Sequence, residues 1–202
     1  MKRETRELLV ATRNLGKVRE IRKALRGLGL RIRSLRDFED VPEVEEDGRT
    51  FVENALKKAR FYSRLFNLLT VSDDSGLVVD SLNGRPGIRS ARFAGEKATD
   101  RENNGKLLNL MEDVPPSRRA SRFRCALAIV SPRGKEEVVE GECRGRIGFK
   151  EVGKRGFGYD PLFILPRLKK TVAQLSLEEK NRVSHRGKAL KKLQKVIRKF
   201  IV

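Results

Sequence analysis

Two adjacent carboxylates follow a short apolar segment in the sequence Ser72-Asp73-Asp74-Ser75-Gly76-Leu77. The preceding residues 68–71 are apolar and β-branched, which predicts a buried strand. A carboxylate at the end of such a strand is costly to ionise unless a cation or hydrogen-bond donors meet it. A divalent metal is one such partner, and oxygen ligands suit magnesium. The alternative is a solvated turn in which Asp73 or Asp74 caps the backbone, and these six residues alone do not decide.

Length and composition indicate a folded, highly charged chain. The 202 residues are 38% hydrophobic and 36% charged, which predicts a single domain over residues 1–202 with its own core. No apolar run reaches the roughly 20 residues of a membrane helix, and the N-terminus lacks a signal-peptide core, so we expect a cytoplasmic protein and no membrane partner. Cys125 and Cys143 are too few for a metal cluster and are expected to be free core thiols; a disulfide would fit only a hyperthermophile.

The formal net charge is +19, from 46 Lys and Arg against 27 Asp and Glu. Such a field attracts polyanions, whether nucleic acid or free nucleotides. A charge-rich, heat-adapted surface that happens to be basic is the alternative. The net charge therefore favours a polyanionic partner and gives no information about the fold.

The segment Thr12-Arg13-Asn14-Leu15-Gly16-Lys17 lies between a predicted strand, residues 7–11, and a predicted helix. A polar turn before a helix N-terminus presents backbone N–H groups and the positive end of the helix dipole to an anion. It is not a Walker A loop, because it has one glycine and the wrong spacing. The segment fits a phosphate site, although many ordinary strand–helix turns look similar.

An acidic segment, residues 39–47, precedes a predicted helix that runs from Thr50 to Phe66. Glu53 completes a capping-box pattern with Thr50. In so basic a chain, the acidic loop is a candidate second source of metal ligands. The alternative is a solvated loop whose acids favour the positive end of the helix dipole.

The C-terminal third combines a glycine-flanked aromatic ring with a single histidine. Phe157 stands between Gly156 and Gly158 beside two cations, which suits stacking on a nucleobase, although the ring would equally well fold into the core. His185 precedes Arg186 among polar residues, which favours an anionic or polar ligand over a structural role. The last helix, residues 188–201, is amphipathic with a basic outer face.

Taken together, these segments resemble the Ham1-like inosine triphosphatases, also described as dITP/XTP pyrophosphatases. The resemblance extends from about Leu9 to Leu193 and rests on five blocks in the same order. These are residues 11–17 (ATRNLGK); 46–48 with 50–51 and 53–55; 73–77 (DDSGL); 156–161 (GFGYDP); and 179–181 with 184–186 (SHR). One block alone is weak, but five in order are specific.

The resemblance implies a mixed α/β fold, with an elongated mixed β-sheet flanked by helices and two lobes around a central substrate cleft. It implies a homodimer that hydrolyses ITP, dITP and XTP to the monophosphate and pyrophosphate with Mg²⁺. Under this resemblance Asp74 is the acid–base residue and a metal contact, Glu46 is the second metal carboxylate, and Ser75 contacts substrate. The phosphate residues would be Thr12, Arg13, Asn14, Leu15, Gly16 and Lys17, and the nucleobase residues Phe157, Gly158, Tyr159, Asp160, Lys180, His185 and Arg186.

Two features of the chemistry bear on this resemblance. Arg13 stands where the family usually has a small or amide residue, and the extra cation adds charge toward phosphate. Hypoxanthine and xanthine present a keto oxygen at position 6, where adenine presents an amino group, so donors such as Arg186 or backbone amides would discriminate. Guanine shares the keto oxygen, and the sequence does not show how it is rejected.

Two other functions remain open at this point. A Maf-like nucleotide pyrophosphatase would act on modified pyrimidines. A basic nucleic-acid-binding protein without turnover would use the net charge and the last helix. The carboxylate pair and the acidic loop would repel a phosphate backbone, so a nucleic-acid partner is not expected.

Overall fold

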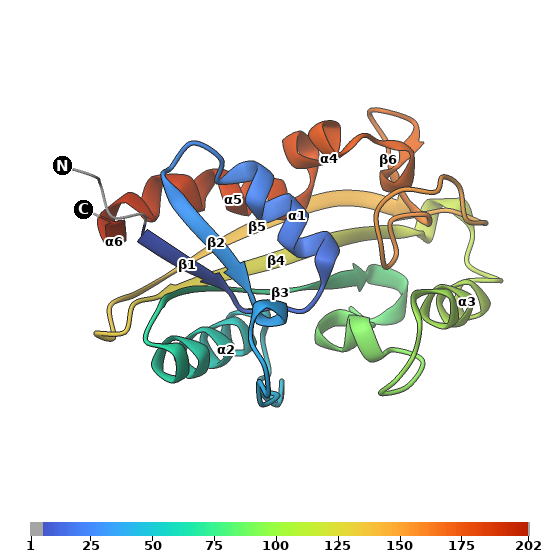
Figure 1. The fold of residues 1–202 in the computed structure, drawn as a ribbon. Coiled ribbons are helices and arrows are strands. Elements are labelled where there is room, and N and C mark those ends of the chain that lie inside the picture. Colours follow the sequence, from blue (N-terminus) through green and yellow to red (C-terminus); the bar gives the residue numbers. More distant parts are fainter. Residues whose placement is uncertain (1–5, 202) are drawn as a thin grey trace. The chain divides into compact units, whose positions relative to one another are not determined.

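The computed structural model describes residues 6–201, and its strands belong to one mixed sheet. The strand order is β2-β1-β3-β4-β5-β6-β7. β1 is parallel to β2 and β3, whereas β6 is antiparallel to β5 and β7. Figure 1 shows the strands and the helices beside them, which confirms the mixed α/β class. The elements are β1 (Arg6–Val10), α1 (Leu15–Ala24), β2 (Leu30–Ser34), α2 (Phe51–Phe66), β3 (Leu69–Val79), α3 (Asp100–Leu110), β4 (Ala120–Val130), β5 (Glu136–Ile147), β6 (Phe163–Leu165), β7 (Lys170–Thr171), α4 (Leu177–Val183), α5 (His185–Val196) and α6 (Arg198–Ile201).

The chain forms two compact units, each built from segments that are separate in the sequence. Unit 1 contains the chain up to residue 74, residues 125–141 and the chain from residue 186. Unit 2 contains residues 75–124 and 142–185. β3, β4 and β5 each contribute residues to both units.

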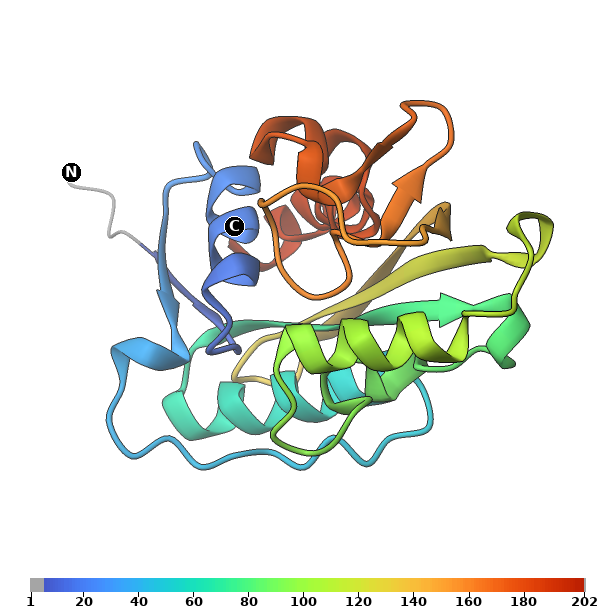
Figure 2. The same cartoon turned by 90° about the vertical axis from the view of Figure 1, so that its right-hand side faces the viewer.

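Unit 1 is layered because successive residues of a strand point to opposite faces of its sheet. Leu8 and Val10 of β1 pack in the same apolar cluster as residues of α1 and α5. Leu9 and Ala11 belong to a second cluster that includes Tyr62 of α2. Figures 1 and 2 show α1 and α5 on one face of β1 and α2 on the other. The strand pattern therefore dictates which helices cover which face.

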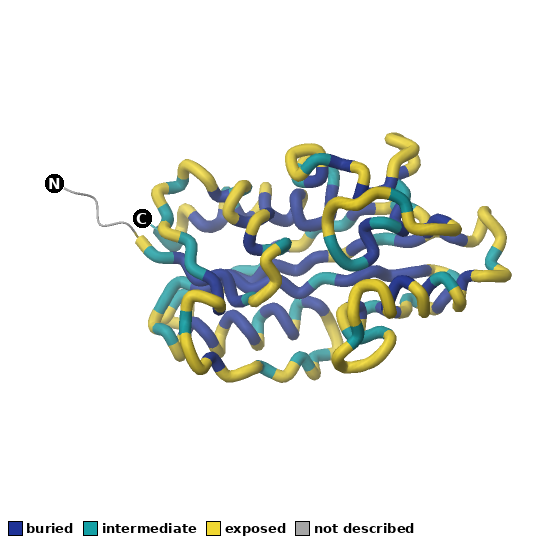
Figure 3. The backbone as a smooth tube through the Cα atoms, turned by 45° about the vertical axis from the view of Figure 1, so that its right-hand side comes forward, coloured by how far each residue is buried: buried dark blue, intermediate teal, exposed yellow. Residues whose placement is uncertain are grey.

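Unit 2 has its own core. Leu77 and Val79 of β3 pack with Leu107 of α3, with Met111 at the C-cap of that helix and with Phe163 of β6. Figure 3 shows the buried course of the strands in dark blue and the exposed turns in yellow. Each unit thus has an apolar core of its own.

β3 corrects the prediction that Asp73 and Asp74 end a strand or form a turn. The segments 68–71 and 77–79 are parts of one eleven-residue strand, and the two carboxylates lie in its middle. By the two-residue period of a strand, Asp73 lies on the face of α1 and α5. Asp74 lies on the face of α2, where the Ser72 hydroxyl donates to the Ala55 carbonyl.

Side chains cap helix starts, and the cap at Thr50 is the one predicted from its capping-box pattern. Thr50, Thr99 and Ser176 cap α2, α3 and α4 through their side chains. The last helix differs from its prediction, because α5 begins at His185 and the short α6 follows it. Within residues 6–201, we find no helix with the length and apolar character that crossing a membrane demands.

The two predicted core thiols are both free and buried. Cys125 packs in the core of unit 1 and Cys143 in that of unit 2. The minority expectation of a disulfide is therefore not met.

A buried arginine holds unit 2 together, and we predict its effect on stability. The Arg119 guanidinium, 2% exposed, donates to the carbonyls of Met111 (2.7 Å), Val114 (3.0 Å), Ile147 (3.0 Å) and Gly148 (2.9 Å). Arg119→Leu leaves these carbonyls without their donor, so the free energy of unfolding should fall by about 3 kcal/mol or more in urea titrations.

The matched control is Arg118→Leu, one residue away and exposed. It should change the free energy of unfolding by no more than about 0.5 kcal/mol. Equal stability of the two variants would contradict a structural role for Arg119.

Candidate active site

Asp73 is the centre of a buried charge network in unit 1. Its Oδ1 lies 2.5 Å from the Lys17 Nζ, and its Oδ2 lies 2.6 Å from the Arg186 Nε. Arg186 Nη1 in turn lies 2.6 Å from Glu20 Oε2. The network joins α1, β3 and α5, which are far apart in the sequence.

The network keeps its members charged. Burial alone would raise the pKa of Asp73, but Arg186 and Lys17 outweigh it and hold that pKa well below its ordinary value. Burial lowers the pKa of Lys17, but Asp73 more than compensates and the net pKa is raised. Asp73 is therefore a fixed anion and a poor proton acceptor near neutral pH.

Asp74 has the opposite character. It is 5% exposed, and among the described residues its Oδ2 has no hydrogen-bond partner. Its Oδ1 lies 3.9 Å from the Lys58 Nζ. Burial raises the pKa of Asp74, although Lys58 and Lys17 partly oppose the shift. A buried carboxylate oxygen without a partner is the signature expected of a group that awaits a ligand or performs chemistry.

Lys58 connects Asp74 to the acidic loop. This residue was not predicted from the sequence to belong to the site. Its Nζ lies 2.7 Å from Glu46 Oε1 and 3.0 Å from the Asp73 carbonyl oxygen. The sequence offered one signal: Lys58 lies on the side of the predicted helix that otherwise carries apolar and small side chains, four residues after Asn54.

The acidic loop is anchored to α2 by a close backbone approach. The Gly48 N–H donates to the Asn54 Oδ1 at 2.8 Å. A Cβ at residue 48 would lie 2.6 Å from that oxygen, so only glycine fits without displacing the side chain. This contact fixes the loop end two residues after Glu46.

The residues present fit a hard divalent cation. Residues 6–201 contain no group of three or more His, Cys, Asp or Glu that would hold a metal without other ligands. Mg²⁺ is commonly bound by one or two carboxylates together with substrate phosphates and water. The unpartnered Asp74 Oδ2 and the partly exposed Glu46 carboxylate are oxygen donors of that kind.

The segment 12–17 forms the predicted turn into α1. Asn14 caps the helix by accepting from the Lys17 N–H at 3.1 Å, and the Thr12 hydroxyl accepts from the Asn14 N–H at 3.1 Å. The Arg13 guanidinium donates to the Val41 carbonyl at 2.9 Å and so contacts the acidic segment. Leu15 is exposed and Gly16 is half-buried. The turn thus presents the helix N-terminus that the sequence predicted.

The loop of unit 2 around Phe157, residues 156–161, is fixed by contacts among its own residues and with Lys180. Gly156 has φ +83°, and a Cβ there would collide with the Asp160 carboxylate. Asp160 Oδ2 accepts from the Phe157 N–H at 3.0 Å and lies 2.5 Å from the Lys180 Nζ, which also lies 4.5 Å from the centre of the Phe157 ring. Phe157 is half-buried, whereas Tyr159 is buried and donates to the Ser90 carbonyl.

Two residues of α3 also hold this loop, and the sequence analysis did not identify them. The Gly158 N–H donates to the Asp100 Oδ2 at 2.6 Å. Asn104 Nδ2 donates to the Gly158 carbonyl at 3.2 Å and to Glu151 Oε1 at 2.6 Å. The pairs are more than 40 residues apart in the sequence, so only the folded chain reveals them.

The remaining predicted residues fall in different surroundings. His185 is buried in unit 2 with its ring stacked on Phe123, the ring centres 4.7 Å apart. Ser75 is the first residue of unit 2, directly after Asp74. Arg186 belongs to unit 1, where it is committed to Asp73 and Glu20, and its assignment to the nucleobase remains a prediction.

We predict that Asp73 is a structural anion. Asp73→Asn leaves the buried Lys17 and Arg186 without their shared counter-charge, so the free energy of unfolding should fall by about 3 kcal/mol or more. Urea titration at neutral pH measures the loss. The same substitution at Asp80, an exposed residue 2.7 Å from the Arg122 Nη1, should cost less than about 1 kcal/mol. Equal losses in the two variants would refute the buried network.

Comparison with known proteins identifies the family. The Ham1 family profile matches residues 8–196. A dITP/XTP pyrophosphatase of Geobacter sulfurreducens is 54% identical over 91% of this chain and 92% of its own length. One from Desulforamulus reducens is 48% identical over 97% of this chain and 98% of its own length. The solved structure of a Ham1 protein from Coxiella burnetii is similar with a TM-score of 0.86 and 39% identity, covering 96% of this chain and 99% of that one. With the fold, the carboxylate pair and the matched length in agreement, the chain belongs to the Ham1 family.

Proposed function

We propose that this protein hydrolyses non-standard purine nucleoside triphosphates (ITP, dITP and XTP) to the monophosphate and pyrophosphate. Relatives that match nearly its whole length are named dITP/XTP pyrophosphatases. The observation that carries the proposal is Asp74, a buried carboxylate with a raised pKa and one oxygen without a partner, between two lysines and Glu46. That constellation suits the hydrolysis of a phosphoanhydride.

Asp74 is the proposed acid–base residue. Water is a poor nucleophile near neutral pH, and a carboxylate within hydrogen-bond reach accepts its proton as the bond to phosphorus forms. The raised pKa of Asp74 brings its basicity closer to the working pH than that of an ordinary aspartate. Asp73 cannot take this role, because its pKa is held low by Lys17 and Arg186.

Positive charge near the carboxylates would stabilise the leaving pyrophosphate. Hydrolysis adds negative charge to the departing phosphates, so groups already aimed at that charge lower the barrier. Lys17 and Lys58 lie on unit 1 beside Asp73 and Asp74. The backbone N–H groups at the start of α1 and the helix dipole add to them, which supports residues 12–17 as the phosphate segment.

Asp74 and Glu46 would hold the divalent ion, and we propose Mg²⁺. When bound, the ion supplies Lewis-acid neutralisation of the phosphate oxygens. Lys58 already occupies the position between these carboxylates, 2.7 Å from Glu46 and 3.9 Å from Asp74. It therefore keeps two anions close together in the absence of the ion.

The loop around Phe157 is the proposed nucleobase segment. Its aromatic ring is half-buried and its position is fixed by Asp160, Lys180 and α3. A ring held in one place loses little entropy when a base stacks on it. Donors for the 6-keto oxygen would come from backbone amides or His185, since the Arg186 guanidinium and the Lys180 ammonium already have carboxylate partners.

We further propose a homodimer and a cytoplasmic location. The family resemblance implies the dimer, and two buried free thiols suit a reducing compartment. Both stay predictions.

Substrate choice tests the activity. With Mg²⁺, pyrophosphate release should be fast for ITP, dITP and XTP and at least tenfold slower for ATP, GTP and dTTP, because adenine lacks the 6-keto oxygen, guanine carries a 2-amino group that the first three bases lack, and thymine is a pyrimidine. Preferential turnover of dTTP would assign a pyrimidine-directed activity instead. Equal turnover of all six would contradict recognition of the base.

We predict that Asp74→Asn abolishes most turnover without loss of fold. The shape is preserved while the proton acceptor is lost, so kcat should fall at least about 100-fold. Stability should be unchanged or increased, since a buried charge with an unpartnered oxygen becomes a neutral amide. Initial rates and urea titration measure the two effects, with Asp80→Asn as the control of full activity. Near-normal kcat in Asp74→Asn would remove Asp74 from the mechanism.

A further inference from the structure

Two neighbouring helices of unit 1 carry lysine and arginine residues on their outer surface. These exposed residues have no role in the proposed catalysis. α1 and α5 lie side by side, joined by the Arg186–Glu20 ion pair and by a hydrogen bond from the Gln194 side chain to the Ala24 carbonyl. Both helices bury their apolar sides in the same cluster, so their other sides face solvent. In Figures 1 and 2 the two helices run along the same face of β1.

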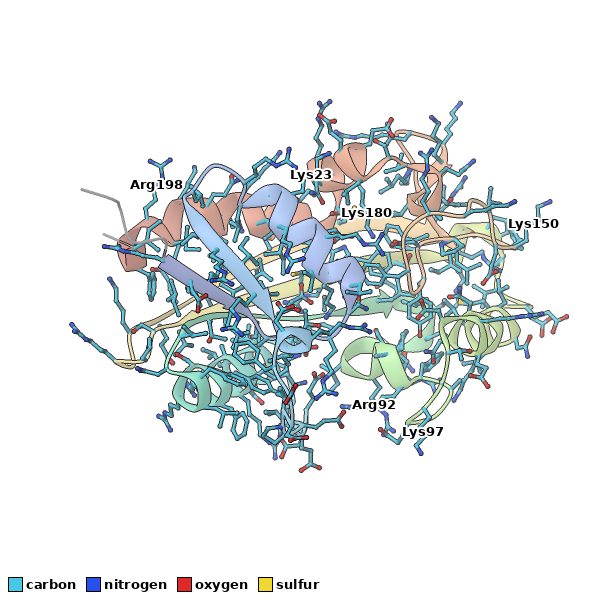
Figure 4. The ribbon with its side chains drawn as sticks, viewed as in Figure 1. Lys23, Arg92, Lys97, Lys150, Lys180 and Arg198 are labelled. Carbon is cyan, nitrogen blue, oxygen red and sulfur yellow. The ribbon has the colours of Figure 1, made fainter. Side chains whose placement is uncertain are left out.

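Five exposed cations define this surface, which we call the basic face. They come from α1 and the turn after it and from α5 and α6: Arg19, Arg26, Lys191, Lys195 and Arg198. Figure 4 shows Arg198 on the outer side of its helix, directed away from the strands. None of the five takes part in the proposed chemistry.

Carboxylates are scarce around these cations. From residue 12 to residue 36 the sequence has one acid, Glu20, which is buried against Arg186, and from residue 181 to the end it has none. Two neighbouring cations do have partners, because Arg22 lies 3.8 Å from Asp37 and Lys199 lies 3.3 Å from Glu137. These two are excluded from the basic face. Its charge is therefore largely uncompensated and available to an external anion.

We infer that the basic face docks the phosphodiester backbone of a duplex nucleic acid. Lys191, Lys195 and Arg198 recur at helical spacing, about one turn or 5.4 Å of rise apart, so they present a row of charges to a row of phosphates. Each neutralised phosphate releases condensed counterions, which supplies sequence-independent affinity. The expected ligand is recognised by its backbone and not by its bases.

Two other polyanions fit this surface less well. A membrane-surface helix needs its apolar side free to enter the lipid boundary, but here those sides are in the core of unit 1. A single strand binds through aromatic stacking, but α1 and α5 contain no aromatic side chain that could stack, and the ring of Phe200 in α6 is half-buried with the Lys135 Nζ 4.7 Å from its centre. Charge without apolar or aromatic groups favours a duplex.

The test compares two variants with the same loss of net charge. The face variant combines Arg26→Gln, Lys191→Gln, Lys195→Gln and Arg198→Gln. The control variant combines Lys97→Gln, Arg101→Gln, Arg118→Gln and Lys150→Gln, four exposed cations of unit 2. Fluorescence anisotropy with a labelled 20-base-pair DNA duplex at 50–200 mM salt measures affinity. Triphosphate turnover and melting temperature report whether each variant is folded.

The wild type should bind the duplex with a steep salt dependence. The face variant should bind roughly tenfold or more weakly at 50 mM salt, and its slope of log affinity against log salt should be smaller by about 3 to 4, at about 0.9 for each lost phosphate contact. The control variant should stay close to wild type, and turnover should persist in both.

Three results would overturn the inference. Equal weakening of the two variants would assign binding to net charge alone. Absence of duplex binding by the wild type at 50 mM salt would remove the site. Binding to vesicles of anionic phospholipid that depends on the same four residues, without binding to the duplex, would assign the face to a membrane surface.

Discussion

The ion pairs of Asp73 with Lys17 and Arg186 are the interaction on which the rest of unit 1 depends. They bring a strand and two helices to one buried point, with Lys17 56 residues before Asp73 and Arg186 113 residues after it. Charges so deeply buried are tolerated only when each finds a partner, and here every member has at least one. The pairing explains why β3 continues through two acidic residues instead of ending there. A buried pair costs desolvation energy, so its value lies in fixing where α1 and α5 sit on the strand.

The same strand places two neighbouring carboxylates in opposite electrostatic environments. Because strand residues alternate in direction, Asp73 meets α1 and α5 while Asp74 meets α2 and the acidic loop. The consequence is two opposite pKa shifts in adjacent residues, one held low by cations and one raised by burial. Pairs of titratable groups whose environments separate their pKa values are typical of acid–base sites. The fold thus distinguishes Asp74 from Asp73 without any difference in residue type, which supports the role proposed for Asp74.

Local signals were readable from the sequence, and long-range contacts were not. The capping residue Thr50 interacts with Glu53 only three residues away, so this pattern predicted the start of α2 correctly. The carboxylate pair was recognised as special, but its place inside a strand depends on Arg186, 113 residues away. Lys58, Asp100 and Asn104 escaped notice because each looks like an ordinary polar residue on a helix until its partner is known. The guanidinium of Arg13 donates to the Val41 carbonyl, a contact that no local pattern indicated, and its role toward phosphate stays a prediction.

We propose that Asp74 and Glu46 receive the metal ion while Asp73 stays bound to its two cations. A crystal structure with Mg²⁺ and a non-hydrolysable analogue of dITP would test it directly. We expect the ion on carboxylate oxygens of Asp74 and Glu46, with the Asp73 contacts to Lys17 and Arg186 unchanged. An ion bound to Asp73, with Lys17 displaced, would contradict the division of roles between the two carboxylates.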